Sequence, residues 1–275
     1  MLNQDKIFKS LKEELVVLKT LKSGPISDIY LCLFKQKKSV MRVDRSWTSS
    51  MKFDRQTEIL LINEIIKLDL APKILYSDIK FGLLIWKFVE GDEFFLDTIN
   101  NKKNLKLLGA SIKKLHEVPV PKIAKNIFKD SLDLYQNNAV KNLENKFLHK
   151  GFNIFKELLK DDEEYVFSHN DLNKTNIILN EKFYFLDWEY AGLNHPYFDL
   201  ALSSSSLNLN EKEISYLWEG YSDNKYALNI KKLHNWSIFS SFLDYMWRLK
   251  VIDLSENTIE TMQINELERE LTPYL

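Results

Sequence analysis

Residues 168–176 read Ser168-His169-Asn170-Asp171-Leu172-Asn173-Lys174-Thr175-Asn176, and residues 186–189 read Leu186-Asp187-Trp188-Glu189. Between these two stretches, a pair of short apolar runs flanks turn-forming residues at 180–182. This pattern predicts a β-hairpin. Because a hairpin returns the chain to its starting point, we expect Asn176 and Asp187 to lie side by side at its open end. Asp171 precedes them on a loop.

These three polar side chains have the chemistry that phosphoryl transfer requires. A nucleotide phosphate is bound with a divalent metal, whose preferred ligands are oxygens such as those of Asn176 and Asp187. An attacking hydroxyl needs a carboxylate to orient it and accept its proton, and Asp171 is the candidate. Protein kinases use the same spacing, His-x-Asp, then Asn five residues later, then Asp beyond a hairpin. A solvated polar loop is the alternative, and the match at all three positions favours the kinase interpretation.

The composition is that of a globular protein without bulk charge. The 275 residues are 45% hydrophobic, which is sufficient for one large domain or two lobes. The net charge of -1 argues against a nucleic-acid partner. The single cysteine, Cys32, excludes an internal disulfide and fits a reducing compartment. There is no apolar signal segment at the start and no run of membrane-spanning length, so we expect a cytoplasmic protein without membrane insertion.

The first part of the chain has mainly strand patterns. A small-residue turn at 23–27 separates two of them, and its backbone N–H groups either cover phosphates or simply close an ordinary hairpin. The next strand carries Arg42 inside an apolar run, and a helical pattern at about 50–69 carries Glu58 beside its apolar stripe. A carboxylate near a buried face needs a cation, so we predict that Arg42 pairs with Glu58. Surface solvation of each side chain is the alternative.

Two further strand patterns, at 73–77 and 82–89, lead to a candidate hinge at 90–92. Beyond this hinge the apolar residues recur with helical period. We therefore predict an α+β fold with two lobes. Residues 1–90 form an N-lobe of antiparallel sheet plus helix, which covers the nucleotide. Residues 91–275 form a mostly helical C-lobe that carries the catalytic loop and the substrate pocket.

Aromatic residues are frequent near the C-terminus, among them Trp236, Tyr245 and Trp247. Core packing is the commoner reason for such a stripe. The alternative is an aromatic pocket that holds a cationic amine by cation–π attraction. Asp199 starts an apolar helix that it can cap, and it can also accept backbone N–H groups of the catalytic loop.

These motifs resemble the choline, ethanolamine and thiamine kinase group, whose relatives are the aminoglycoside phosphotransferases. The resemblance is strong over residues 168–201, where His-Asn-Asp-Leu-Asn, Leu-Asp-Trp-Glu-Tyr-Ala-Gly and Phe-Asp-Leu-Ala stand in order, and weak beyond residue 205. It implies a protein-kinase-like fold that uses ATP and Mg²⁺. The implied substrate is a small, cationic alcohol, with choline first and thiamine or ethanolamine as alternatives. An aminoglycoside substrate and a non-catalytic binding role rank last.

The resemblance also implies roles for single residues. It makes Asp171 the catalytic base, Asn176 and Asp187 the Mg²⁺ ligands, Arg42 braced by Glu58 the phosphate-binding pair, the backbones of Lys87 and Val89 the adenine contacts, and Trp236 with Tyr245 or Trp247 the amine site. We assign structural support to His169 and Asp199. One position departs from the family pattern. Seven residues after the Asp of Phe-Asp-Leu-Ala the family commonly has an acidic residue, and this chain has Ser206.

Overall fold

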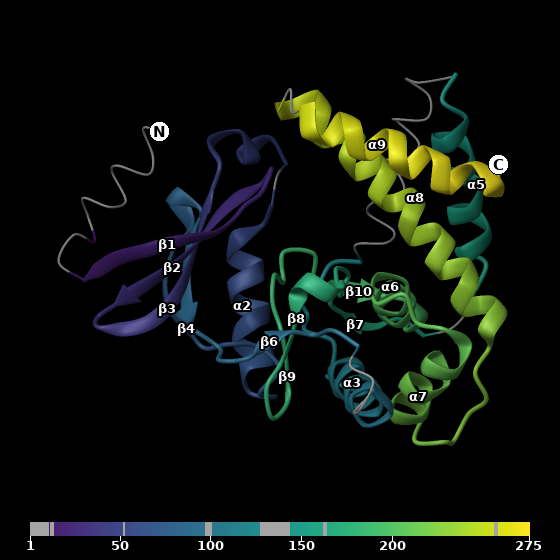
Figure 1. Ribbon diagram of the computed structural model, residues 1–275, viewed down its shortest axis with the longest axis horizontal. Helices are drawn as coiled ribbons and strands as arrows, with labels where there is room; N and C mark the ends of the chain where they lie inside the picture. The colour runs from purple at the N-terminus through teal and green to yellow at the C-terminus, as the bar shows by residue number, and fades with distance from the viewer. Residues whose placement is uncertain are drawn as a thin grey trace. The chain divides into compact units, whose positions relative to one another are not determined.

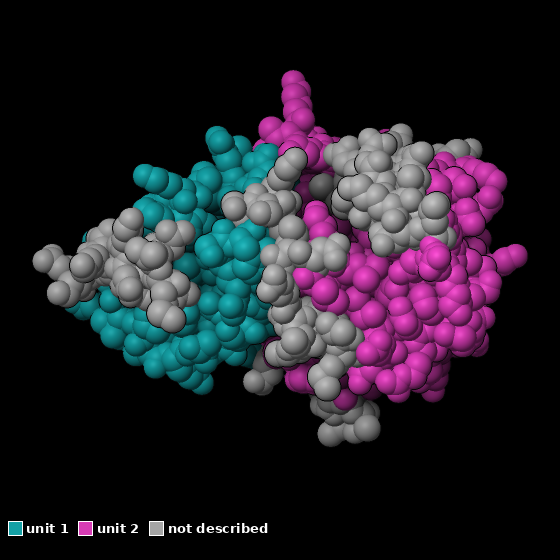
Figure 2. All heavy atoms as spheres, turned by 90° about the horizontal axis from the view of Figure 1, so that it is seen from above, with its two compact units in different colours: residues 1–91 teal, residues 92–275 magenta. Residues whose placement is uncertain are grey.

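The structure is a computed structural model that describes residues 11, 14–51, 53–96, 101–126, 144–161, 164–255 and 258–275. The chain divides into two compact units, Met1–Gly91 and Asp92–Leu275, which are coloured separately in Figure 2. We call them unit 1 and unit 2. The first contains an antiparallel sheet and the second is mostly helical, so the α+β fold class predicted from the sequence is confirmed.

Unit 1 is a five-stranded antiparallel sheet accompanied by one long helix (Figure 1). The strand order is β1-β2-β3-β5-β4. The elements are β1 (Leu15–Ser23), β2 (Ser27–Phe34), β3 (Lys37–Asp44), η1 (Ser46–Met51), α2 (Arg55–Ile66), β4 (Ile74–Asp78), η2 (Ile79–Phe81) and β5 (Leu83–Lys87).

Strand β3 lies in the middle of this sheet, between β2 and β5. Its side chains alternate between the two faces, so Met41 and Val43 share one face and Arg42 points to the other. Met41 and Val43 have no exposed surface, and they belong to the core of unit 1. Helix α2 begins after Asp54, whose side chain accepts the N–H of Thr57 at 3.0 Å. This cap explains why the helix is shorter at its start than the apolar periodicity predicted.

Unit 2 combines helices with two small sheets. Its elements are β6 (Asp92–Glu93), α3 (Asn101–His116), α5 (Lys146–Leu158), β7 (Val166–Ser168), η3 (Lys174–Asn176), β8 (Ile177–Leu179), β9 (Phe183–Phe185), β10 (Gly192–Asn194), α6 (Tyr197–Ser206), α7 (Glu211–Ser222), α8 (Ile230–Ser255), α9 (Thr258–Leu271) and η4 (Thr272–Tyr274). Strands β6, β8 and β9 form one sheet, and β7 pairs with β10. Helix α8 packs against α5, α6 and α9, while α3 packs against α7 (Figure 1). None of the helices in the described ranges is long and apolar enough to cross a bilayer.

The predicted hairpin is confirmed, and it positions the site. Strands β8 and β9 pair in antiparallel fashion, with Ile177 opposite Phe185. Both side chains have no exposed surface, and burial of one face of the hairpin fixes its register. The N–H of Leu186 donates to the carbonyl of Asn176 at 2.9 Å. Asn176 and Asp187 are therefore neighbours at the open end of the hairpin.

Candidate active site

Asp171 lies on the loop between β7 and η3, and its carboxylate is held by two amide side chains. Asn173 donates from Nδ2 to Oδ1 at 3.0 Å, and Asn176 donates from Nδ2 to Oδ2 at 2.9 Å. Burial of the carboxyl, followed by the negative charge of Asp187, raises the pKa of Asp171 to about 7. The two Asn hydrogen bonds act in the opposite direction. The loop therefore places an oriented proton acceptor close to a second carboxylate.

Asn176 and Asp187 offer the oxygens that a metal requires. The Asn176 amide nitrogen donates both to the side chain of Asp171 and to its carbonyl, the latter at 2.8 Å. This directs the amide oxygen of Asn176 away from Asp171. Asp187 is exposed and has a left-handed backbone with φ 64°. One amide oxygen and two neighbouring carboxylates form the hard donor set that Mg²⁺ prefers, so the residues present fit this ion.

Asp199 fixes the backbone of the catalytic loop from the start of α6. Its carboxylate accepts the N–H of His169 at 2.8 Å and the N–H of Asn170 at 2.9 Å. The backbone contacts predicted from the sequence are therefore present. The Nε2 atom of His116 lies 3.1 Å from the same carboxylate. Burial tends to raise the pKa of Asp199, but the hydrogen bond and charge of His116 outweigh it and hold the pKa below its ordinary value.

His169 connects the catalytic loop to the segment that carries Asp187. Its Nε2 atom lies 2.9 Å from the carbonyl of Leu186, and its Nδ1 atom accepts the N–H of Asp171 at 3.2 Å. This pair of contacts requires a neutral ring with the proton on Nε2. Burial lowers the pKa of His169, which agrees with that assignment. The ring therefore acts as a fixed spacer between two site residues.

In unit 1, Arg42 and Glu58 form the predicted ion pair. The Nη1 and Nη2 atoms of Arg42 donate to the two carboxylate oxygens of Glu58 at 2.8 and 2.7 Å. Each residue is 4% exposed, so the alternative of surface solvation is wrong. Arg55 and Asp44, to which the sequence interpretation assigned no role, extend the pair. Arg55 reaches Glu58 at 2.9 Å and Asp44 at 2.8 Å.

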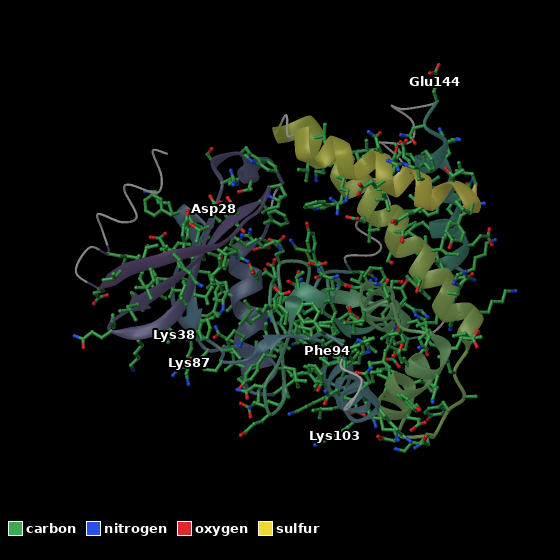
Figure 3. All side chains as sticks on the ribbon, in the orientation of Figure 1. Asp28, Lys38, Lys87, Phe94, Lys103 and Glu144 are labelled. Carbon is green, nitrogen blue, oxygen red and sulfur yellow. The ribbon has the colours of Figure 1, made fainter. Side chains whose placement is uncertain are left out.

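Lys87 and Val89 lie at and just after the end of strand β5, shortly before unit 1 ends at Gly91. Lys87 is the last residue of β5, where its backbone N–H donates to the carbonyl of Lys73 at 2.9 Å. Figure 3 shows Lys87 and Lys38 at the same end of the sheet. Val89 lies beyond the strand and is partly buried. Their contact with adenine stays a prediction.

The three aromatic residues predicted to form a substrate pocket have different surroundings. Trp236 has no exposed surface and stacks on His195 with ring centroids 4.7 Å apart. Tyr245 is 1% exposed and donates to Glu268 at 2.7 Å. Core packing, the alternative given by the sequence, accounts for both. Trp247 is partly exposed on α8, which leaves it as the pocket candidate among the three.

Tyr190 is a candidate site residue that the sequence interpretation missed. Its hydroxyl accepts the Nε1–H of Trp247 at 2.7 Å. Burial raises the pKa of Tyr190 well above its ordinary value, and the charges of Glu189 and Asp171 add to this effect. The phenol therefore stays neutral, within reach of the field of Asp171. Its place in the Leu-Asp-Trp-Glu-Tyr-Ala-Gly motif could have identified Tyr190 as a candidate. Its contact with Trp247 was not predictable from a local pattern, because the two residues are 57 positions apart in the sequence.

Ser206, the position where the chain departs from the family pattern, contacts the catalytic loop. Its Oγ atom accepts the N–H of Lys174 at 2.7 Å. The hydroxyl thus satisfies a backbone group at the start of η3. It gives the loop a hydrogen-bond acceptor without adding a negative charge.

The comparison of the sequence with protein families gives a match over most of the chain. The family model for choline/ethanolamine kinases matches residues 18–268. A LicA homolog from Mycoplasma capricolum subsp. capricolum is 30% identical over 200 residues, which cover 71% of this chain and 77% of that protein. The LicA protein of Haemophilus influenzae is 41% identical over 61 residues, or 21% of this chain and 23% of that protein.

Solved structures share the fold at low sequence identity. The choline kinase LicA from Streptococcus pneumoniae has a TM-score of 0.77 at 17% identity, with 100% of both chains covered. A structure of LicA in complex with AMP has a TM-score of 0.74 at 19% identity, covering 100% of this chain and 98% of that one. An ethanolamine kinase from Plasmodium vivax has a TM-score of 0.69 at 16% identity, covering 94% of this chain and 81% of that one.

Proposed function

Because the chain belongs to the choline/ethanolamine kinase family and is thus an ATP-dependent alcohol phosphotransferase, we propose that its substrate is choline. The observation that carries this proposal is the hydrogen bond between Trp247 and Tyr190, which places two aromatic side chains next to each other. A quaternary ammonium has no N–H group to donate, so aromatic faces and nearby negative charge are what recognise it. The structure described as a choline kinase from Streptococcus pneumoniae supports the same choice.

Ethanolamine is the second candidate, because the family includes ethanolamine kinases. A primary ammonium carries three N–H donors and needs hydrogen-bond acceptors around it. Ser206 weighs against choline, since its hydroxyl, which already accepts a backbone N–H, stands where the family commonly has a carboxylate that helps to hold the amine. The same negative charge is missing for ethanolamine. Thiamine remains an alternative with the same chemistry.

In the proposed reaction, the substrate oxygen attacks the γ-phosphorus of ATP. A new P–O bond forms, the bond between the γ-phosphorus and the bridging oxygen breaks, and ADP leaves. The hydroxyl proton passes to Asp171, whose two oxygens are oriented by Asn173 and Asn176. Hydrogen bonds from amide groups to both oxygens fix the orientation of the carboxylate. The carboxylate is therefore positioned to accept the proton of one hydroxyl group.

The proposal also assigns residues to the nucleotide and its metal. Arg42 binds the phosphates, and the backbones of Lys87 and Val89 contact adenine. Asn176 and Asp187 would hold magnesium, which neutralises the charge that develops on the transferred group. ATP is plentiful in the cytoplasm, where we place the enzyme.

The test is a coupled ADP-release assay with choline, ethanolamine, thiamine and an aminoglycoside in parallel. We expect choline to give the highest kcat/KM. Asp171→Ala should lower kcat by about a hundred- to ten-thousandfold while ADP still binds. Trp247→Ala should raise the KM for choline by about tenfold, because the aromatic face is lost, and Trp247→Phe should restore most of it.

Two outcomes would overturn parts of the proposal. A higher kcat/KM for ethanolamine or thiamine would reject choline as the substrate and leave the phosphotransferase activity intact. Normal turnover by Asp171→Ala would reject this residue as the base. Glu157→Ala is the control, because Glu157 lies on α5 and forms an exposed ion pair with Lys160, so its loss should leave all constants unchanged.

A further inference from the structure

Unit 1 contains a buried cluster of four charged side chains from two elements. Arg42 and Asp44 belong to β3, and Arg55 and Glu58 belong to α2. Arg42 uses both terminal nitrogens on Glu58. Arg55 donates from Nε and Nη2 to the two oxygens of Asp44 at 2.8 and 2.9 Å, and from Nη1 to Glu58 at 2.9 Å. Arg42, Arg55 and Glu58 are 4%, 7% and 4% exposed, and the side chain of Asp44 is 12% exposed.

The cluster contains two positive and two negative charges, and Arg55 is responsible for that balance. Without it, Arg42 would be the only cation of the four, placed 2.7 Å from Glu58 and 3.8 Å from Asp44. Two carboxylates and one guanidinium carry a net negative charge, which repels an anion. At such short distances in a buried cluster, a change of one unit in the net charge strongly changes the electrostatic energy of an anion near Arg42.

The direction in which the pKa of Glu58 is shifted agrees with this count. Burial alone would raise the pKa of Glu58, but the charges and hydrogen bonds of Arg42 and Arg55 outweigh it and hold the pKa below its ordinary value. Glu58 is therefore ionised at neutral pH, and both guanidinium groups are engaged in keeping it so. A phosphate group that approaches Arg42 meets a guanidinium whose carboxylate partner is already shared with Arg55.

We propose that Arg55 is a positioning residue for the nucleotide: by neutralising Glu58 and Asp44, it leaves Arg42 with positive charge for the phosphates. This inference rests on the proposed function, in which Arg42 binds ATP. A purely mechanical role for Arg55, as a clamp of α2 on the sheet, uses the same hydrogen bonds. The two roles predict different ADP affinities when the charges of Asp44 and Arg55 are removed one at a time or together.

The experiment measures the Kd for ADP with Mg²⁺ by calorimetry, together with the KM for ATP, the KM for the alcohol and kcat. Arg55→Gln should weaken ADP binding by about tenfold or more and leave the KM for the alcohol unchanged. Arg55→Lys, which keeps the charge and loses the fork, should bind ADP better than Arg55→Gln. The double variant Asp44→Asn with Arg55→Gln restores the charge balance and should recover most of the affinity.

The single variant Asp44→Asn separates the two roles by the sign of its effect. It removes one negative charge, so the charge role predicts ADP binding equal to or tighter than that of the wild type. It also removes one of the two oxygens that accept hydrogen bonds from Arg55, so the clamp role predicts weaker binding. This variant keeps the proposal testable if Arg55→Gln does not fold. Lys67→Gln is the control, because Lys67 lies just after α2 and is paired only at the surface, with Glu64.

Each outcome decides one question. Unchanged ADP affinity in Arg55→Gln, or weaker binding in both Asp44→Asn and the double variant, would overturn the role of Arg55 and leave the proposed function standing. A wild-type protein that binds no ADP would overturn the proposed function itself. Recovery of affinity in the double variant would support the charge role.

Discussion

Asp199 has no exposed surface and accepts backbone N–H groups from His169 and Asn170 on the catalytic loop. Replacement by alanine leaves both N–H groups buried without their acceptor. We expect Asp199→Ala to lower the free energy of unfolding by about 2–6 kcal/mol, at about 1–3 kcal/mol for each group. Urea unfolding measures this change, with Glu157→Ala on the exposed face of α5 as a surface control of unchanged stability. An Asp199→Ala variant as stable as the wild type would contradict the bracing role.

The pH dependence of the same residue has a definite sign. His116 and the backbone hydrogen bonds lower the pKa of Asp199, although its burial acts in the opposite direction. A depressed folded-state pKa adds stability that is complete above the unfolded value of about 4 and is lost as the pH falls through the folded value. The stability difference between the wild type and Asp199→Ala should therefore be constant from neutral pH to about 4 and shrink below it.

Single residues also show where sequence reasoning reaches its limit. Asn176 and Asp187 were placed side by side correctly because a short hairpin joins them. The contact between His116 and Asp199 spans 83 residues, and no local pattern indicates it. Trp236 has the spacing of both a core residue and a pocket residue, and only packing against His195 separates the two. For Asn176 and Asp187, the prediction succeeded because the chain itself fixes the distance between them.

At the scale of elements, the reactivity of Cys32 measures how readily the sheet of unit 1 opens. Cys32 is the single cysteine, lies on β2 and has no exposed surface. Burial raises the pKa of its thiol to about 11, and only the thiolate reacts with alkylating reagents. We expect iodoacetamide at pH 8 to modify the folded protein about a hundredfold or more slowly than the urea-unfolded protein.

Mass spectrometry measures this modification, and the urea-unfolded protein is the internal control because its one thiol should react completely. Comparable rates in the folded and unfolded protein would show that β2 opens readily, contrary to its position between β1 and β3.

Sequence periodicity predicted strands on both sides of the turn at 23–27. It did not predict which strands are neighbours, because the order β3-β5-β4 depends on contacts between distant segments.

At the scale of the whole molecule, nucleotide binding should change the stability of the folded chain. A ligand that binds only the folded state stabilises it by about 2.7 kcal/mol at a hundred times its Kd. We expect Mg²⁺ with ADP to raise the Tm by about 5–10 °C in scanning fluorimetry. Chelation of the metal with EDTA should remove most of the shift, because ADP then lacks its partner at Asn176 and Asp187. Asp187→Asn should lose most of the shift as well, whereas Lys67→Gln should keep it. A shift that survives both EDTA and Asp187→Asn would mean that ADP binds without the hairpin residues, and the metal site proposed for unit 2 would then be wrong.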